Sequence, residues 1–444
     1  MPPRATVAAA APGDAPRSHV HSTLLIVAGT SAFHLAQLGV VVFINKFATP
    51  DVVGHYFFAM AIAFPLLLLC GLELRAALVA DGARQFTVGT YLRLRSLGVT
   101  VAGLALAAVL VWHWSAHRDP AALLILGGAF AARLAWSLGE VGWGTYQLRE
   151  RLDLMALSYF LRGLAVIGPF AVLLPLAEPL GLATPEQRAA VAIAALWLNA
   201  TGMLAVHVLF DRPRIVRRGG WDLGHTWRAV RGLALQTLPL GLVALIINLC
   251  DSLPRWLFAS PLVTDGHAQL GYFGSLVYVT IAGNLLVTQI ATASANRLAR
   301  SYAESLPRFL RLTMRLVVVA LLIAAGMLAL AFFVPRTLLR LLYTLDYVQF
   351  APEFRLIIAG HALALLTNIL GIAITQMRLY WVQVPAQVVT LVATVVAALV
   401  LIPGPQPVHG AAATTVVRAV TQFAVYAPCF LLGVYARARR GTAS

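Results

Sequence analysis

Four arginines stand inside stretches of sequence that are otherwise apolar: Arg75, Arg133, Arg162 and Arg418. A charged side chain at membrane depth is costly in free energy and is usually functional. Guanidinium groups recognise phosphate through two parallel hydrogen bonds. Because few acidic residues share these stretches, the excess positive charge cannot face lipid. It predicts a hydrated, arginine-lined cavity that suits an anionic ligand, phosphate above all.

Several of these charges also have a purely structural interpretation. Arg75 is near enough to the end of its apolar stretch for its guanidinium to extend to the lipid headgroups. Arg133 and Glu140 are seven residues apart and share a helix face, so they also fit a clasp between helices. Asp251 and Arg255 are one helical turn apart and fit an ion pair. The sequence leaves both interpretations open.

Sequence patterns for catalysis and metal binding are missing. The chain has no glycine-rich phosphate loop, no His and Cys cluster at metal-ligand spacing, and no Ser, His and Asp pattern. Its three cysteines, Cys70, Cys250 and Cys429, all fall in apolar runs. That placement is typical of packing residues rather than of a disulfide framework. The sequence therefore predicts no metal, no cofactor and no enzyme active site.

The composition places the chain in a membrane. Of its 444 residues, 60% are hydrophobic and 11% are charged, whereas soluble domains average about 45–50% apolar and about 25% charged residues. The net charge of +16 does not indicate a nucleic-acid partner. The basic residues lie in short hydrophilic breaks between apolar runs, as they do in the cytoplasmic loops of membrane proteins.

Twelve apolar stretches approach the roughly 20 residues that a helix needs to cross the hydrocarbon core. They predict an all-α, polytopic membrane protein of about 12 transmembrane helices in two six-helix halves. The stretches are residues 22–46, 52–79, 97–116, 121–146, 154–176, 189–209, 232–259, 269–294, 313–334, 354–376, 381–403 and 410–435.

Basic residues follow the topology that these stretches imply. With the N-terminus inside, 22 of the 33 Lys and Arg residues fall in cytoplasmic segments and seven at the outer ends and loops. This bias is the one expected of membrane proteins, and it predicts that both termini are cytoplasmic.

The stretches divide the chain into five parts. We expect a disordered cytoplasmic tail, an N-terminal half, a basic cytoplasmic connecting loop, a C-terminal half and a short cytoplasmic tail. These are residues 1–21, 22–210, 211–231, 232–436 and 437–444.

A faint repeat relates the two halves. GHYF, from Gly54, opens the second stretch, and GYF, from Gly271, opens the eighth, which is second in its own half. An even number of helices in each half relates the halves by an axis along the membrane normal.

Two segments carry a resemblance to a known family. GHYFFAMAIAFPLLLLCGLELR, in the second stretch, and INLCDSLPRWLFASPLVTDGHAQLGYFGSLVYVT, which opens the second half, resemble one branch of the multidrug/oligosaccharidyl-lipid/polysaccharide (MOP) exporter superfamily. That branch is the polysaccharide transporters. Wzx-type flippases of O-antigen and exopolysaccharide units are the most similar in architecture, over nearly the whole chain.

The resemblance implies a MATE/MOP-like fold in the bacterial inner membrane and a lipid-linked oligosaccharide carried on undecaprenyl diphosphate. Arg75 and Arg133 are then the leading diphosphate contacts, and Arg162 and Arg418 are secondary ones. Glu140 and Asp251 are the candidate ion-coupling carboxylates. Membrane lipids, a polysaccharide polymerase and a chain-length regulator are the implied partners.

Other functions stay open at this point. A multidrug or cation antiporter of the same superfamily would need buried carboxylates, whereas the buried excess here is positive. A membrane enzyme of glycan assembly, such as an O-antigen polymerase or ligase, would need an outer pocket, for which Asp346, Glu353 and Arg355 are the candidates. A scaffold without transport activity would leave the buried arginines unexplained.

Overall fold

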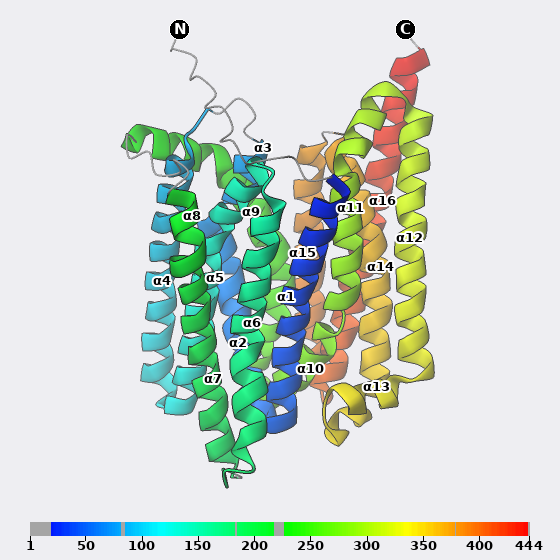
Figure 1. The fold of residues 1–444 in the computed structure, drawn as a ribbon. Coiled ribbons are helices and arrows are strands. Elements are labelled where there is room, and N and C mark those ends of the chain that lie inside the picture. The colour runs from blue at the N-terminus through cyan, green and yellow to red at the C-terminus, as the bar shows by residue number, and fades with distance from the viewer. Residues whose placement is uncertain (1–18, 81–84, 183, 217–225, 378, 443–444) are drawn as a thin grey trace.

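Helices connected by turns make up the part of the chain that the computed structural model describes, which comprises residues 19–80, 85–182, 184–216, 226–377 and 379–442. Figure 1 shows the helices running roughly parallel in one bundle. The elements are α1 (His19–Phe47), α2 (Pro50–Gly71), α3 (Leu74–Ala80), α4 (Val88–His117), α5 (Pro120–Leu148), α6 (Leu152–Ala177), α7 (Pro185–Ala205), the π-helix η1 (Val206–Asp211), α8 (Arg212–Val216), α9 (Trp227–Phe258), α10 (Gly266–Tyr278), α11 (Ile281–Glu304), α12 (Leu306–Phe333), α13 (Pro335–Leu342), the 3₁₀ helix η2 (Leu345–Phe350), α14 (Ala351–Gln376), α15 (Tyr380–Leu401) and α16 (Pro407–Thr442).

Eleven of the helical segments in the described residues are long and apolar enough to cross a membrane. The predicted eighth stretch, residues 269–294, is instead divided between α10 and α11 by a turn at Val279 and Thr280. Because α11 carries polar residues such as Asn284 and Gln289, it is less apolar than the eleven membrane-crossing segments. The polytopic all-α fold is confirmed, with α10 and α11 in the place of the predicted eighth stretch.

Local sequence signals set several helix starts. The Thr87 and Asp119 side chains accept hydrogen bonds from the first backbone N–H groups of α4 and α5. Thr184 and Gln187 form a reciprocal capping box at α7. These caps satisfy donors that would otherwise be unpaired at the ends of the helices.

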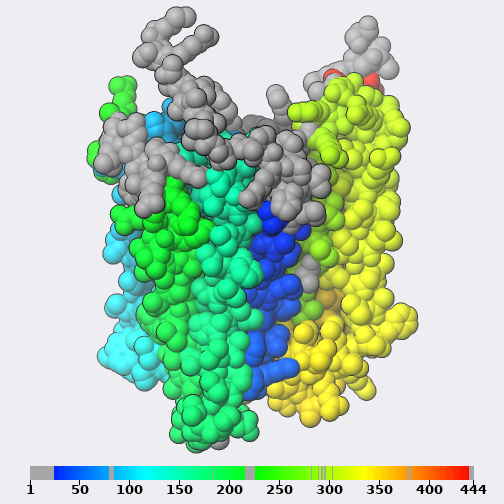
Figure 2. Space-filling model, in the orientation of Figure 1, coloured from blue at the N-terminus to red at the C-terminus, as the bar shows by residue number. Residues whose placement is uncertain are grey.

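The two halves occupy opposite sides of the molecule (Figures 1 and 2). The start of α1 and the end of α16 lie at one end of the bundle, here called the terminal end. The short helix α13 lies at the opposite end. Most of the predicted N-terminal tail, residues 1–18, lies outside the described residues, whereas 437–442 of the predicted C-terminal tail continue α16.

Helix α9 packs against the first half although it belongs to the second. Near its start, Val230 and Leu233 share a hydrophobic cluster with Leu74 and Tyr91. Near its far end, the Trp256 indole N–H donates to the Ala61 carbonyl of α2 at 3.2 Å. The middle of the predicted connecting loop, residues 217–225, lies outside the described residues, and α9 takes up its last residues from Trp227 onward.

Helices α2 and α10 meet at the end opposite the terminal end. A Cβ atom added at Gly54 would lie 1.8 Å from the His267 carbonyl oxygen, and one at Gly271 would lie 2.3 Å from the Pro50 carbonyl oxygen. Only glycine allows backbones to approach this closely. The two glycines that suggested a repeat in the sequence therefore lie opposite each other where the halves meet.

A buried polar cluster joins the halves at the same end. The Asn45 side-chain amide of α1 donates to the Ser275 hydroxyl of α10 at 2.9 Å, and Tyr347 of η2 donates to the Asn45 side-chain carbonyl. The Tyr343 hydroxyl donates to the Ser275 carbonyl at 2.7 Å. All four side chains are buried, so this cluster holds the opposite end of the bundle closed.

Replacing Asn45 by alanine is expected to lower stability by about 1–3 kcal/mol, because the Tyr347 and Ser275 hydroxyls lose their shared buried partner. Thermal unfolding of the purified protein in detergent measures the change. Asn248→Ala is the matched control, since the Asn248 side-chain amide donates only to the Ala244 carbonyl of its own helix. Equal losses in the two variants would show that the cluster contributes no more than a local bond.

Candidate functional site

The six predicted site residues do not converge on one cavity. Arg75, Arg133, Arg162 and Glu140 lie within the first half, on α3, α5 and α6. Asp251 on α9 and Arg418 on α16 form an ion pair that joins these two helices. The ion pairs of the structure then separate the arginines into those already neutralised and those that are not.

Arg162 is fully neutralised by a residue outside the predicted set. Its Nη2 lies 2.9 Å from the Asp211 carboxylate, and both side chains are 0% exposed. The Tyr146 hydroxyl also donates to this carboxylate at 3.4 Å, and Arg162 donates to the Ala135 carbonyl at 3.3 Å. A Cβ at Gly139 would lie 2.6 Å from the guanidinium, so glycine is needed to admit it. This pair is a buried link between α6 and η1.

Glu140 is paired with Arg95 rather than with Arg133. Arg95 was predicted to lie in a cytoplasmic segment, but α4 begins at Val88, so Arg95 is two turns inside the helix and 4% exposed. Its Nε donates to the Ser137 carbonyl at 2.7 Å. The open face of Gly71 makes room for its guanidinium. The Glu140 carboxylate therefore neutralises a buried charge on a neighbouring helix.

Asp251 is paired across helices with Arg418, not with Arg255 in its own helix. The Asp251 side chain is 47% exposed and that of Arg418 is 21% exposed. The Arg255 Nε is buried and has no hydrogen-bond partner within the described residues. Of the predicted carboxylates, Asp251 is thus the more accessible, and a third charged group stands one turn away from it.

Arg133 has no carboxylate within ion-pair distance in the described part of the chain. Its side chain is buried, its Nε contacts the Met60 sulfur at 3.0 Å, and its guanidinium lies 4.3 Å from the centre of the Phe64 ring. A sulfur and an aromatic face are weak partners for a guanidinium. Apart from a side-chain hydrogen bond with Tyr278, Arg133 therefore has only weak partners within the described residues and keeps donors for a ligand.

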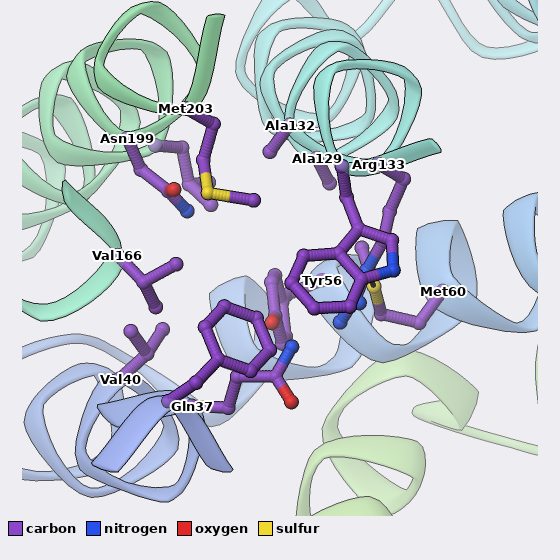
Figure 3. A pocket seen from close by; sticks show the side chains of 13 residues that line it. Gln37, Val40, Tyr56, Met60, Ala129, Ala132, Arg133, Val166, Asn199 and Met203 are labelled. Atoms are coloured by element: carbon purple, nitrogen blue, oxygen red, sulfur yellow. Dashed lines mark hydrogen bonds between the residues drawn. The ribbon is translucent and has the colours of Figure 1, made fainter. Parts of the chain in front are cut away.

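A small pocket lies beside Arg133 within the first half (Figure 3). Gln37 of α1, Tyr56 of α2 and Asn199 of α7 line it together with apolar side chains. The buried side-chain oxygen of Asn199 has no protein partner among the described residues. The cavity volume is about 20 Å³, which is room for about one water molecule. A larger ligand therefore requires the helices around Arg133 to separate.

Arg75 lies at a break in the second membrane-crossing segment. Leu72 and Glu73 both have left-handed backbone conformations, with φ of 52° and 50°, and they separate α2 from α3. The Arg75 guanidinium donates to the Tyr159 hydroxyl at 3.0 Å and to the Gln147 side-chain carbonyl at 3.4 Å. Its side chain is only partly buried. The break thus places a second cation, held by neutral partners, in the same half as Arg133.

One curated protein is similar to this chain in sequence over most of its length. Over 374 residues, 83% of this chain and 88% of the relative, the chain is 22% identical to the capsular polysaccharide biosynthesis protein CapF of Staphylococcus aureus. No protein-family model matches the chain.

Solved structures with the same architecture are transporters. A MOP superfamily transporter from Pyrococcus furiosus matches with a TM-score of 0.66 at 15% identity, over 94% of this chain and 95% of that one. The chain therefore has the fold of this MOP superfamily transporter. The lipid II flippase MurJ, in an inward closed conformation, matches with a TM-score of 0.68 at 10% identity, over 93% of this chain and 90% of that one.

The chain is a multi-pass membrane protein of two helical halves, as the sequence predicted, with partly unneutralised arginines in the first half and an accessible ion pair beside the second. Asp211, Arg95 and the close approach of Gly54 to Gly271 were not among the predicted site residues. Only the glycines left a trace in the sequence, as the faint repeat.

Proposed function

We propose that this protein moves a lipid-linked oligosaccharide, carried on undecaprenyl diphosphate, from one leaflet of the bacterial inner membrane to the other. The observation that carries the proposal is the pair of arginines in the first half, Arg75 and Arg133, that have no carboxylate within ion-pair distance in the described residues. The CapF relative and the MurJ likeness support a lipid-linked glycan as the cargo.

The orientation follows from the basic residues. The terminal end carries most of the arginines outside the membrane-crossing segments, so we assign it to the cytoplasm. The end closed by Gly54, Gly271 and the Asn45 cluster then faces the periplasm. In this assignment the substrate enters from the cytoplasmic side, where it is made.

The proposed mechanism is alternating access with the lipid tail left in the bilayer. Arg133 and Arg75 offer charge-assisted hydrogen bonds to the diphosphate, which replace the hydration that it loses on leaving the headgroup region. Movement of one half against the other then opens the outer end. Arg162 stays bound to Asp211 throughout, so its role is to hold α6 against the end of α7.

Ion coupling is assigned to the accessible pair rather than to the buried one. Protonation of Asp251 would remove its attraction to Arg418 and leave two cations, Arg255 and Arg418, near each other. Such a change favours a different arrangement of α9 and α16. Glu140 is the weaker candidate, because Arg95 and the Ser137 carbonyl hold that pair in place.

The test is flipping of a short undecaprenyl-diphosphate-linked saccharide in proteoliposomes. Arg133→Ala is expected to lower the flipping rate by about 10- to 100-fold, because charge-assisted hydrogen bonds contribute about 1.5–3 kcal/mol. Arg133→Lys keeps the charge but not the forked donors, so its loss should be smaller. Arg75→Ala is also expected to lower the flipping rate.

Arg336→Ala is the matched control, since Arg336 is exposed at the opposite end of the bundle. Thermal unfolding in detergent shows whether each variant is folded. If the wild type flips no lipid-linked saccharide but exports cationic dyes, the antiporter alternative replaces this proposal. If it flips the saccharide and Arg133→Ala does so equally well, the arginine site is wrong.

A further inference from the structure

A second cationic site lies at the terminal end, outside the region around Arg133. It is a hollow of about 530 Å³ between the end of α11 and the start of α12. Five arginines and one glutamate line it, with Ser301 and Leu312: Arg297, Arg300, Glu304, Arg308, Arg311 and Arg315. This set is here called the α11–α12 arginine site.

The spacing of these residues builds the site from two helix faces. Arg297, Arg300 and Glu304 stand at positions i, i+3 and i+7 of α11, so they share one face. Arg308, Arg311 and Arg315 have the same spacing on α12. The two helices are joined through the single residue Ser305, which brings both charged faces to one hollow.

Most of this charge has no internal partner. Among the described residues, the site has one ion pair, which joins Arg308 to Glu304 at 2.9 Å, one turn apart. Within the described residues, Arg297, Arg300, Arg311 and Arg315 have no carboxylate within ion-pair distance. A phosphate group accepts hydrogen bonds from one or two guanidinium groups, so four unpaired guanidiniums match about two phosphates.

An apolar track continues from the site along α12. Met314, Val318, Leu321 and Leu322 are all exposed, with Met314 61% and Leu322 68% exposed. In a membrane these side chains face acyl chains, and the arginines above them lie at headgroup depth. Charge above and an apolar track below fit a lipid rather than a free anion.

We propose that the α11–α12 arginine site binds the headgroup of a membrane lipid that carries two phosphates. The lipid is either a two-phosphate bilayer phospholipid or a polyprenyl diphosphate, and both offer the same chemistry to the arginines. This site is separate from Arg75 and Arg133 and does not depend on the transport of any substrate.

The test counts bound lipid on the purified protein by native mass spectrometry. The ligands are cardiolipin, undecaprenyl diphosphate, phosphatidylglycerol and inorganic pyrophosphate. The double variant Arg300→Gln/Arg311→Gln removes one unpaired charge from each helix. The matched control, Arg336→Gln/Arg340→Gln, removes two exposed arginines from α13 at the opposite end.

A two-phosphate lipid is expected to bind the wild type and the control alike, and to bind Arg300→Gln/Arg311→Gln about tenfold or more weakly. Phosphatidylglycerol, with one phosphate, should bind more weakly than the two-phosphate lipids. Tight binding of cardiolipin alone identifies a resident phospholipid, and tight binding of undecaprenyl diphosphate alone identifies a carrier lipid. Either result supports the site.

Equal binding by the wild type and Arg300→Gln/Arg311→Gln overturns the proposal, as does an equal loss in the control or binding of pyrophosphate as tight as that of the lipids. The flipping assay separates this result from the proposed function. A wild type that binds lipid but flips nothing contradicts only the proposed function. A wild type that flips while the double variant binds lipid normally contradicts only the α11–α12 arginine site.

Discussion

Asp211→Ala is expected to destabilise the protein by about 3–5 kcal/mol, because it leaves the Arg162 guanidinium buried without a counter-charge. Neither side chain of this pair is exposed to solvent, so water cannot replace the lost carboxylate. The measurement is the thermal unfolding midpoint in detergent, together with the amount of folded protein recovered from membranes.

Two comparisons sharpen this prediction. Glu304→Ala breaks an ion pair whose side chains are 57% and 66% exposed, and such pairs contribute only about 0.3–0.5 kcal/mol. The double variant Asp211→Ala/Arg162→Met removes both charges, so it should recover much of the stability lost in Asp211→Ala. If the unfolding midpoint of Asp211→Ala is no lower than that of Glu304→Ala, the buried pair is not a main source of stability in the first half.

Gly271→Val is expected to open the end of the bundle opposite the termini. A Cβ at this position would lie 2.3 Å from the Pro50 carbonyl oxygen and 3.2 Å from the Gly54 backbone nitrogen. Neither backbone atom can move alone, so α2 and α10 must separate. The reporter is a cysteine placed at Ser275 (Ser275→Cys), a position that is buried in the wild type. We expect it to react with a membrane-impermeant maleimide at least about tenfold faster in Gly271→Val than without that change, because a buried thiol reacts only when the structure around it opens.

The reporter is used in a background without Cys70, Cys250 and Cys429. Gly326→Val is the matched control, because an added Cβ at Gly326 meets nothing within 4 Å. It carries the same change in helix propensity without the contact. Unchanged labelling of the reporter in Gly271→Val would mean that the glycine contact does not keep this end closed.

The fold was predictable because each helix carries its own evidence. Each segment that crosses the lipid must be an apolar helix, because only its own hydrogen bonds satisfy its backbone there. Hydropathy therefore reveals the helices one at a time. The α10–α11 break was missed because residues 269–294 are apolar on average, although Asn284 and Gln289 reduce the apolarity of α11. A mean over a stretch cannot locate a turn inside it.

The partners of the charged residues were not predictable in the same way. Asp251 and Arg418 are 167 positions apart, and nothing in a single sequence relates them. Asp211 was placed in the connecting loop because Arg212 and Arg214 follow it, whereas η1 continues α7 and carries its carboxylate inward. Spacing along one helix suggested that Asp251 pairs with Arg255 and Glu140 with Arg133. In the folded protein, packing between helices instead places Arg418 beside Asp251 and Arg95 beside Glu140.

The position of α9 has a consequence for how the protein bends. One stretch of this helix is packed on the first half through Val230 and Leu233, while Asp251 farther along it is tied to Arg418 of the second half. Pro239, which lies between them in the helix, has no backbone N–H, so the helix lacks one internal bond there. Trp256, beyond both residues, bonds again to Ala61 of the first half, so a flex at Pro239 alone does not free α9 from that half. Any swing of the halves must therefore loosen the contacts of α9 with α15 and α16, the Asp251–Arg418 ion pair among them. The boundary between the moving parts therefore runs beside α9, so a helix that belongs to the second half by sequence would move with the first.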